Sequence, residues 1–437
     1  MVIAVIGFLY FRKGTTMPGE ENFGTNFLSQ FNPFGSKKPT PPTVMPPVVD
    51  VSGYEPGSGE ETLKVKLTKV SSMPIAGFVV FIKERLKEVA TTPPPAPFLN
   101  EGGEGGGNSK PKPALKPTPP PTEFVPALRY VEKARGIIYQ TFADKIEERK
   151  FSVTTIPRVY EAYFGNHGDS VVIRYLKGDG KTIETFVGTL PKEYLGADTI
   201  GDNEIKGSFL PNNIKDISVS PDTTKIFYLF ENVDNIIGTT LSLLDNKKVQ
   251  VFDSPFTEWL SQWPNDKTII LSTKPSFSIP GYMYSIDLAK KSLTKTLGDI
   301  NGLTTLTSPD GKLVLYANGN LSLSLYHTDT RNSDLLGVQT LPEKCVWGKV
   351  SDVVYCAVPK AIDAGGYPDA WYQGEVSLRD QLWKIDIKNG NATLLVDPIT
   401  VVGGEEIDGI KLALDEGENY LFFVNKKDSF LWKLELK

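Results

Sequence analysis

The sequence of 437 residues predicts an all-β fold, a seven-bladed β-propeller. From Phe124 to the end, short apolar and aromatic runs alternate with turn residues, and no long amphipathic helix interrupts them. A proline-containing turn recurs at Pro221, Pro264 and Pro309, at intervals of 43 and 45 residues. A repeat of about 40–45 residues with several strands indicates a propeller, because a four-stranded sheet buries both faces only between neighbouring sheets.

Each repeat also contains an apolar strand that ends in an acidic residue. These acids are Asp245, Asp287, Asp329, Asp386 and Glu435. The first two intervals are 42 residues each, and the next two are 57 and 49. The longer spacing indicates an insertion in the sixth blade.

A Ser-Pro-Asp turn, an apolar strand and then an aromatic-rich strand ending in Asp resemble the TolB-like, WD40-type β-propeller repeats of bacteria. The resemblance is clearest over residues 214–340. The Gly-His and Trp-Asp dipeptides of eukaryotic WD40 repeats are missing. The resemblance implies a propeller that binds, and it implies no particular reaction.

Two further blades precede the clear repeats. Residues 159–210 contain the strands of one blade, and residues 127–156 contain three strands of another. The apolar run 74–81 supplies the innermost strand of that first blade. Six blades would result if residues 159–190 did not form a sheet, and eight is the other alternative.

The last stretch of the chain contains only three strands, so its sheet lacks a fourth. The alternating run 62–70 is the available strand, and we expect it to lie beside residues 429–437. This N-terminal strand would close the last blade and remove an exposed sheet edge. We therefore expect the propeller to span residues 62–437.

Two segments are rich in proline and glycine. Residues 17–60 and 83–123 together hold 18 of the 33 prolines. Such composition offers too little apolar surface to offset the entropy of ordering, so it predicts disordered segments. We expect a flexible tether over residues 17–61 and a low-complexity insertion inside the first blade at 83–123.

The first eleven residues are apolar and are followed by Arg12 and Lys13. Ten helical residues rise about 15 Å, half of a bilayer core of roughly 30 Å. Residues 1–16 are therefore expected to be a truncated membrane anchor, with an uncleaved signal or a hydrophobic strand as alternatives. We expect an extracytoplasmic propeller, although the two basic residues favour the cytoplasmic side.

Sequence motifs for catalysis and cofactor binding are missing. No G-x-S-x-G, H-E-x-x-H, P-loop or strand-linked G-x-G-x-x-G motif occurs. A net charge of −5 argues against nucleic-acid binding, and two cysteines with two distant histidines argue against a zinc site. We expect no catalytic, cofactor-binding or metal-binding residues, and a noncatalytic protein that binds a protein or cell-envelope component.

A propeller enzyme of the lyase or glycosidase type is the alternative function. Its acids would come from the innermost strands and line the central channel. The candidates are Glu161, Asp216 and Glu258.

Cys345 and Cys356 lie on runs that we expect to form adjacent antiparallel strands. A four-residue turn between the strands would set the two cysteines opposite each other, and a two-residue turn would leave them diagonal. A disulfide and two buried free thiols are both compatible with this pattern. A disulfide would favour an extracytoplasmic location.

The long connection at residues 359–381 interrupts the sixth blade. It carries Tyr367, Asp369, Trp371 and Tyr372 among glycines and a proline. Aromatic residues in loops on a rigid scaffold commonly bind partners, so these four are candidate partner-binding residues. Alternatively, the aromatics fold back to plug the channel or to cover the next blade.

Overall fold

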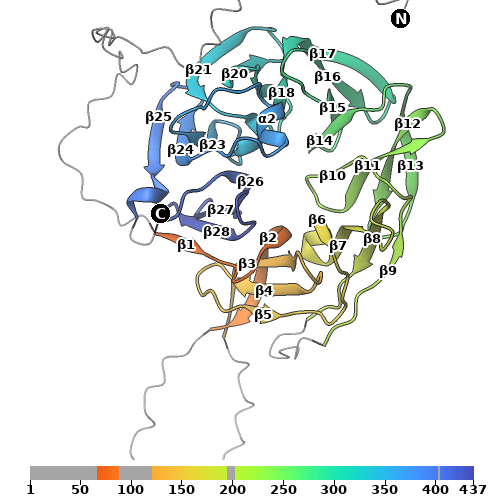
Figure 1. Cartoon of the computed structure of the whole chain (residues 1–437). Helices are drawn as coiled ribbons and strands as arrows, with labels where there is room; N and C mark the ends of the chain where they lie inside the picture. The colour runs from red at the N-terminus through yellow and green to blue at the C-terminus, as the bar shows by residue number, and fades with distance from the viewer. Residues whose placement is uncertain (1–65, 88–120, 194–201, 402–403) are drawn as a thin grey trace, which may run out of the picture. The chain divides into compact units, whose positions relative to one another are not determined.

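The computed structural model describes residues 66–87, 121–193, 202–401 and 404–437. Their strands form seven four-stranded antiparallel sheets, arranged as blades around a central channel (Figure 1). In blades 1 to 6 the strand order in each sheet follows the order in the chain, from the channel outwards. The predicted seven-bladed propeller is confirmed.

The first three blades contain the strands up to residue 254. Blade 1 comprises β2 (Ile75–Leu86), β3 (Thr122–Glu132), β4 (Ile138–Phe142) and β5 (Arg149–Lys150). Blade 2 comprises β6 (Val159–Gly165), β7 (Ser170–Leu176), β8 (Ile183–Thr189) and β9 (Lys206–Phe209). Blade 3 comprises β10 (Asp216–Val219), β11 (Lys225–Asn232), β12 (Asn235–Ser242) and β13 (Lys248–Ser254).

The remaining four blades complete the ring. Blade 4 comprises β14 (Trp259–Asn265), β15 (Thr268–Thr273), β16 (Pro280–Asp287) and β17 (Ser292–Asn301). Blade 5 comprises β18 (Thr304–Thr307), β19 (Leu313–Ala317), β20 (Ser322–His327) and β21 (Ser333–Gln339). Blade 6 comprises β22 (Cys345–Trp347), β23 (Val353–Pro359), β24 (Asp380–Asp386) and β25 (Ala392–Val396). Blade 7 comprises β26 (Gly409–Leu414), β27 (Tyr420–Asn425), β28 (Leu431–Glu435) and β1 (Leu67–Lys69).

Helical segments in the described residues are short and lie in the connections. They are η2 (Asn166–Gly168), η3 (Pro342–Lys344), α2 (Asp369–Tyr372) and η4 (Pro398–Thr400). In the part of the chain that the structure describes, no helix is long and apolar enough to cross a membrane. The expected anchor at 1–16 and tether at 17–61 lie outside the described residues.

The recurrent Ser-Pro-Asp turns connect the innermost strand of a blade to the second strand. The Ser220 hydroxyl donates to Asp222 (2.5 Å) and accepts from the backbone N–H of Lys225 (2.9 Å). Ser308 makes the same two contacts in blade 5. The motif suits a turn because the serine and aspartate side chains form hydrogen bonds where the backbone changes direction and cannot continue the strand pairing.

Blade 7 is closed by the N-terminal strand, as predicted. Strand β1 pairs with β28 in antiparallel register, with Leu67 opposite Leu434 and Lys69 opposite Trp432. The seam to blade 1 is filled by buried apolar side chains from both blades: Ile75, Leu128, Tyr130, Phe422 and Leu431. The core of the protein lies in such layers between the blades, where both faces of each sheet are covered.

In blade 1, the strands that flank the insertion are longer than the sequence indicates. Strand β2 continues to Leu86 and β3 begins at Thr122, so both enter the expected insertion 83–123. Residues 88–120 between them are outside the described residues. Arg85 extends the pairing because its guanidinium binds Glu123 (2.7 Å) and Asp144 (2.5 Å). Ion pairs between different strands cannot be predicted from the amino-acid composition of one segment, so the sequence did not indicate these longer strands.

Cys345 and Cys356 form a disulfide between β22 and β23. The two residues are directly opposite in the register. The Gly348 N–H donates to the carbonyl of Val353, so four residues form the turn. Of the two turns considered from the sequence, the structure has the four-residue turn, which places the cysteines opposite each other. Of the two states considered for the cysteines, it has the disulfide.

The disulfide yields a stability prediction. It closes a loop with a sequence separation of 11, and the chain-entropy relation gives about 3 kcal/mol of stabilisation for such a loop. We expect the free energy of unfolding, measured by urea titration, to fall by this amount in the Cys345→Ala/Cys356→Ala variant. The same decrease is expected for the wild type when it is unfolded and refolded under reductant. Two titratable thiols in protein purified and denatured without reductant would contradict the bond.

Candidate binding site in the central channel

The innermost strands of the seven blades surround a cavity of about 590 Å³. Each of these strands begins at the end of the propeller where second and third strands are joined, here called the mouth face. The charged lining residues lie early in their strands: Glu161 is third in β6, Asp216 is first in β10 and Lys411 is third in β26. These charged groups therefore lie towards the mouth-face end of the cavity.

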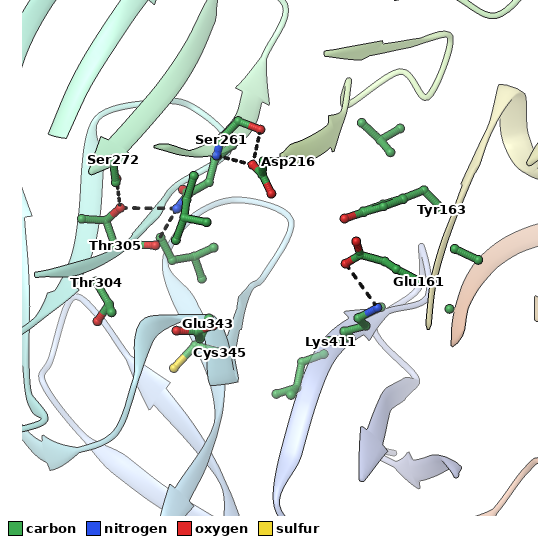
Figure 2. A pocket seen from close by; sticks show the side chains of 18 of the residues that line it. Glu161, Tyr163, Asp216, Ser261, Ser272, Thr304, Thr305, Glu343, Cys345 and Lys411 are labelled. Carbon is green, nitrogen blue, oxygen red and sulfur yellow. Dashed lines mark hydrogen bonds and ion pairs between the residues drawn. The ribbon is translucent and has the colours of Figure 1, made fainter. Parts of the chain in front are cut away.

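Glu161 is the acid that cations neutralise. Its carboxylate accepts from the guanidinium of Arg174 on β7 at 2.5 Å. Lys411 Nζ lies 3.9 Å from the other oxygen of Glu161 (Figure 2). The pair with Arg174 is part-buried, so it is screened less than a surface pair.

Asp216 lies on the neighbouring blade and is held by neutral donors. Its Oδ2 accepts from the backbone N–H of Ser261 (2.5 Å) and from the Ser261 hydroxyl (2.7 Å) (Figure 2). Burial raises the pKa of Asp216 to about 6, although both hydrogen bonds favour the carboxylate. Asp216 therefore changes charge near neutral pH.

Glu343, in η3, is a third carboxylate at the cavity. It accepts a hydrogen bond from the hydroxyl of Tyr372, on the sixth-blade connection. Its side chain reaches water in the channel, yet protein surrounds it, and the resulting loss of hydration raises the pKa of Glu343 to about 6. Three acids, one from blade 2, one from blade 3 and one from the connection between blades 5 and 6, thus line the same cavity (Figure 2).

Hydroxyl and amide groups form the opposite part of the wall. The Gln262 side chain donates to the carbonyl of Thr305 (2.5 Å) and accepts from the backbone N–H of Thr307 (3.0 Å). Ser272 and Thr305 share a hydrogen bond of 2.8 Å. Thr304 is 5% exposed, and its hydroxyl has no partner among the described residues. Most polar groups of this wall therefore have partners within the protein, whereas the hydroxyls of Thr304 and Thr307 have none among the described residues.

Lys411 owes its position to a backbone irregularity. The register of β26 against β27 shifts between Ile410 and Ala413, and Lys411 has φ of 53°. A non-glycine residue in this region costs about 1–3 kcal/mol and is over-represented at functional sites. The amine donates to the carbonyl of Ala76 at 3.1 Å. Desolvation lowers the pKa of Lys411, against the attraction of Glu161.

The sixth-blade connection folds back over neighbouring blades. Tyr367 and Trp371 are each 3% exposed, and Asp369 accepts from the backbone N–H of Phe277 in blade 4 (2.5 Å). Tyr372 is 36% exposed and lines the cavity. Of the four residues predicted to contact a partner, two are buried in this conformation, and Tyr372 is the one that reaches both solvent and the channel.

A buried ionic network fastens this connection. Lys344, Asp380 and Asp408 have fully buried side chains, and Lys344 Nζ binds Asp380 at 2.8 Å and also binds Asp408. Asp408 accepts from Trp371 Nε1 (3.0 Å) and from the backbone N–H of Leu378 (3.0 Å). Sequence reasoning missed this network, because its members come from three separate segments.

The three acids proposed for an enzyme are not brought together. Glu161 and Asp216 line the cavity, but Glu258 does not. Glu258 precedes β14, its side chain is 57% exposed, and it pairs with Lys274 at 3.1 Å. Its placement on an innermost strand was wrong by one residue, because the strand starts at Trp259.

Groups of three or more His, Cys, Asp or Glu side chains that could hold a metal ion are not found among the described residues. His167 lies in η2, and His327 contacts Asp334 at 2.9 Å on blade 5. Neither histidine lines the cavity.

No protein-family model matches the sequence, and no curated protein matches it. Among solved structures, TolB from Acinetobacter baumannii is 13% identical with a TM-score of 0.38, and the match covers 60% of this chain and 59% of TolB. An oligogalacturonate lyase from Vibrio parahaemolyticus is 9% identical, with a TM-score of 0.49 and coverage of 71% and 86%. An oligogalacturonate lyase in complex with manganese is 11% identical, with a TM-score of 0.45 and coverage of 71% and 85%.

These likenesses concern the fold alone. The expected likeness to TolB-like propellers is confirmed at that level by the seven four-stranded sheets of this chain.

Proposed function

We propose that this protein is a noncatalytic binding propeller that presents its mouth face and channel to a protein or cell-envelope component. The observation that carries the proposal is that the cavity's charged groups are held by fixed neighbours. Arg174 binds Glu161 at 2.5 Å, and Ser261 donates two hydrogen bonds to Asp216. Polar groups held fixed around a cavity suit recognition of a ligand or partner.

The proposal includes tethering to a membrane with the propeller on the extracytoplasmic side. The apolar start and the proline-rich segment 17–61 support the tether by their composition. The Cys345–Cys356 disulfide supports an oxidising compartment. As a scaffold, the protein would hold its partner at a distance from the bilayer.

Exposed aromatic side chains support the mouth face as the contact surface. Phe256 is 72% exposed in the connection between blades 3 and 4, and Phe277 is 44% exposed in the connection from β15 to β16. Tyr372 lies in the equivalent connection of blade 6. Alternate connections of an antiparallel blade emerge at the same end, so these aromatics lie on the mouth face, the end at which Glu161, Asp216 and Lys411 lie in their strands.

Site-specific photocrosslinking in a bacterial envelope tests this proposal. A photoreactive amino acid at Phe256 or Tyr372 is expected to give discrete crosslinked species. Leu244 (65% exposed) and Val350 (73% exposed) lie in third-to-fourth and first-to-second connections, at the opposite end, and are the controls; their exposure matches that of Phe256 and exceeds that of Tyr372. Equal crosslinking at both ends, or none at the mouth face, would contradict the proposal.

One observation favours an enzyme as the second candidate. Glu161 and Asp216 lie on neighbouring innermost strands, and a carboxyl group with a pKa of about 6 suits a general acid. A lyase or glycosidase would use this pair. Turnover of a polysaccharide that disappears in Glu161→Gln and Asp216→Asn, with folding retained, would favour the enzyme over the binding module.

A further inference from the structure

The buried ionic network of the sixth-blade connection brings together the groups that form an amide bond. Lys344 supplies a primary amine, and Asp380 and Asp408 supply carboxyl groups. The lysine lies in η3, Asp380 is the first residue of β24, and Asp408 directly precedes β26. All three side chains are 0% exposed. Among the described residues no other ion pair has both side chains fully buried, so this network is the one most isolated from water.

The amine contacts both carboxyl groups. Lys344 Nζ lies 2.8 Å from Oδ2 of Asp380, and it also contacts Oδ1 of Asp408. The Trp371 ring covers the amine, with its centroid 5.1 Å from Nζ. Groups that a fold holds in contact can react as if each were present at about 10⁵–10⁸ M. The fold therefore removes the entropic obstacle to a reaction between Lys344 and a neighbouring aspartate.

Asp408 is surrounded by hydrogen-bond donors. Trp371 Nε1 donates to both of its oxygens, at 3.1 and 3.0 Å. Its Oδ2 also accepts from the backbone N–H of Leu378 (3.0 Å) and from the Ser377 hydroxyl (3.3 Å). An ionised carboxylate only accepts hydrogen bonds, so these donors suit the anionic form. Asp408 is thus placed to act as a base beside the amine.

Asp380 differs from Asp408 because only one of its oxygens is bonded. Oδ2 accepts from the backbone N–H of Gly409 at 2.6 Å and contacts Lys344, whereas Oδ1 is buried without a partner among the described residues. Loss of hydration raises the pKa of Asp380, against the attraction of Lys344. The departure of Oδ1 would therefore break no hydrogen bond within the protein.

The surroundings of the network favour uncharged groups. A buried apolar cluster borders it and includes Trp371 and Leu378, which both donate to Asp408. In water, hydration of an ammonium and a carboxylate favours the separated ions over the amide. In a buried site that hydration is lost, so the charged reactants are destabilised relative to a neutral product.

We infer that Lys344 and Asp380 join in an intramolecular amide bond, an isopeptide bond, with Asp408 as the catalytic base. A proton moves from Nζ through Asp408 to Oδ1 of Asp380, which gives a neutral amine and a neutral acid. The amine then attacks Cγ of Asp380, a second proton follows the same route, and Oδ1 leaves as water. One N–C bond forms, one C–O bond breaks, and Asp408 returns to its carboxylate form. No oxidant, reductant or cofactor takes part.

The bond would fasten the sixth-blade connection covalently. It joins η3, ahead of β22, to the first residue of β24, and so encloses the Cys345–Cys356 disulfide and the aromatics of the connection. Reductants cleave a disulfide but not an amide, so this attachment persists where the disulfide does not. Oδ2 of Asp380 becomes the amide oxygen and keeps its hydrogen bond from Gly409. The inference is independent of the proposed binding function.

Mass spectrometry of the full chain, denatured and treated with reductant, tests the inference. The intact mass is expected to be lower than the sequence requires by one water molecule. After trypsin digestion, residues 332–349 are expected to be joined to residues 380–384, because an amide-bonded Lys344 is no longer a cleavage site. Recovery of these peptides unjoined would overturn the inference, even with a lower intact mass, because dehydration at Asp408 and Gly409 leaves them separate. Joining of 332–349 to 389–411, which contains Asp408, would overturn the choice of Asp380.

The same digest contains a matched control. Lys360 Nζ lies 2.7 Å from Oδ2 of Asp397, but the lysine side chain is 43% exposed. Water hydrates this pair, so the peptides that contain the two residues are expected to be separate. Equal joining at this pair would show that contact alone forms the bond, and it would contradict the role assigned to burial and to Asp408.

Variants identify the reacting groups. Lys344→Arg and Asp380→Ala are each expected to abolish the joined peptide. In Asp408→Ala, Lys344 stays an ammonium for lack of a base, and joining after cell-free synthesis is expected to be about 100-fold slower or more, as for loss of a general base. Asp352→Asn, which removes the exposed partner of Lys388, is expected to join as fast as the wild type.

Thermal unfolding of each variant checks that it folds, and the wild-type digest decides the inference if a variant does not. Joining at the wild-type rate in folded Asp408→Ala would exclude Asp408 as the base. A joined peptide in Asp380→Ala would exclude Asp380 as the bonded residue.

Discussion

Deletion of residues 1–70 is expected to destabilise the propeller by about 5 kcal/mol, the sum of several lost strand hydrogen bonds and one buried valine. The deletion removes β1, whose Leu67–Lys69 pairs with β28, and it removes Val70, which is 3% exposed and donates to the carbonyl of Leu431 at 2.7 Å. Strand β28 then becomes an open edge, so self-association is also expected. Urea titration and size-exclusion chromatography measure the two effects.

The matched control is deletion of residues 1–61, which leaves the closing strand in place. Its urea midpoint is expected to equal that of the full chain. If both deletions unfold at the same midpoint and remain monomeric to the same degree, ring closure by β1 does not stabilise the fold.

Asp408→Ala is expected to cost about 3–5 kcal/mol, the range found when one partner of a buried ion pair is removed. The substitution leaves the buried ammonium of Lys344 with Asp380 alone, and it removes the acceptor of Trp371 Nε1 and Leu378 N–H. The sixth-blade connection should then detach from blade 7. A lower urea midpoint and a changed tryptophan fluorescence would report the two consequences.

Asp352→Asn is the comparison for this effect. Asp352 pairs with Lys388 at 3.5 Å, and the lysine is largely exposed. Exposed pairs contribute about 0–1 kcal/mol, so this variant is expected to unfold close to the wild type. If the two variants had similar urea midpoints, the buried Asp408 network would contribute no more to stability than the exposed Asp352–Lys388 pair.

The fold could be predicted because the repeat is a local property. Ser220, Pro221 and Asp222 form their turn through hydrogen bonds within six residues, and the same motif recurs two blades further along at Ser308. Strand closure was also predictable, since a three-stranded last blade needs a partner for its edge. The candidate site was predicted only in part: Glu161 and Asp216 follow from their place on innermost strands.

The remaining site residues depend on contacts between distant segments. Glu343 lies in a connection, and nothing in its neighbours indicates that it borders the channel. Lys411 enters the cavity because of a bulge in β26, and bulges have no reliable local pattern. The aromatics at 367–372 were identified from sequence as a distinctive cluster, but the burial of Trp371 depends on Asp408, which accepts from its indole N–H and binds Lys344.

The sequence by itself determined the strand periodicity, the number of blades and the strand that closes the ring, because these follow from alternation, turn chemistry and the need to cover sheet edges. The tertiary structure alone decided which acids are neutralised, where the sixth-blade connection lies and whether the cysteines are bonded. Those outcomes depend on distances between side chains from different blades, and Coulomb and desolvation energies change steeply with such distances and with burial.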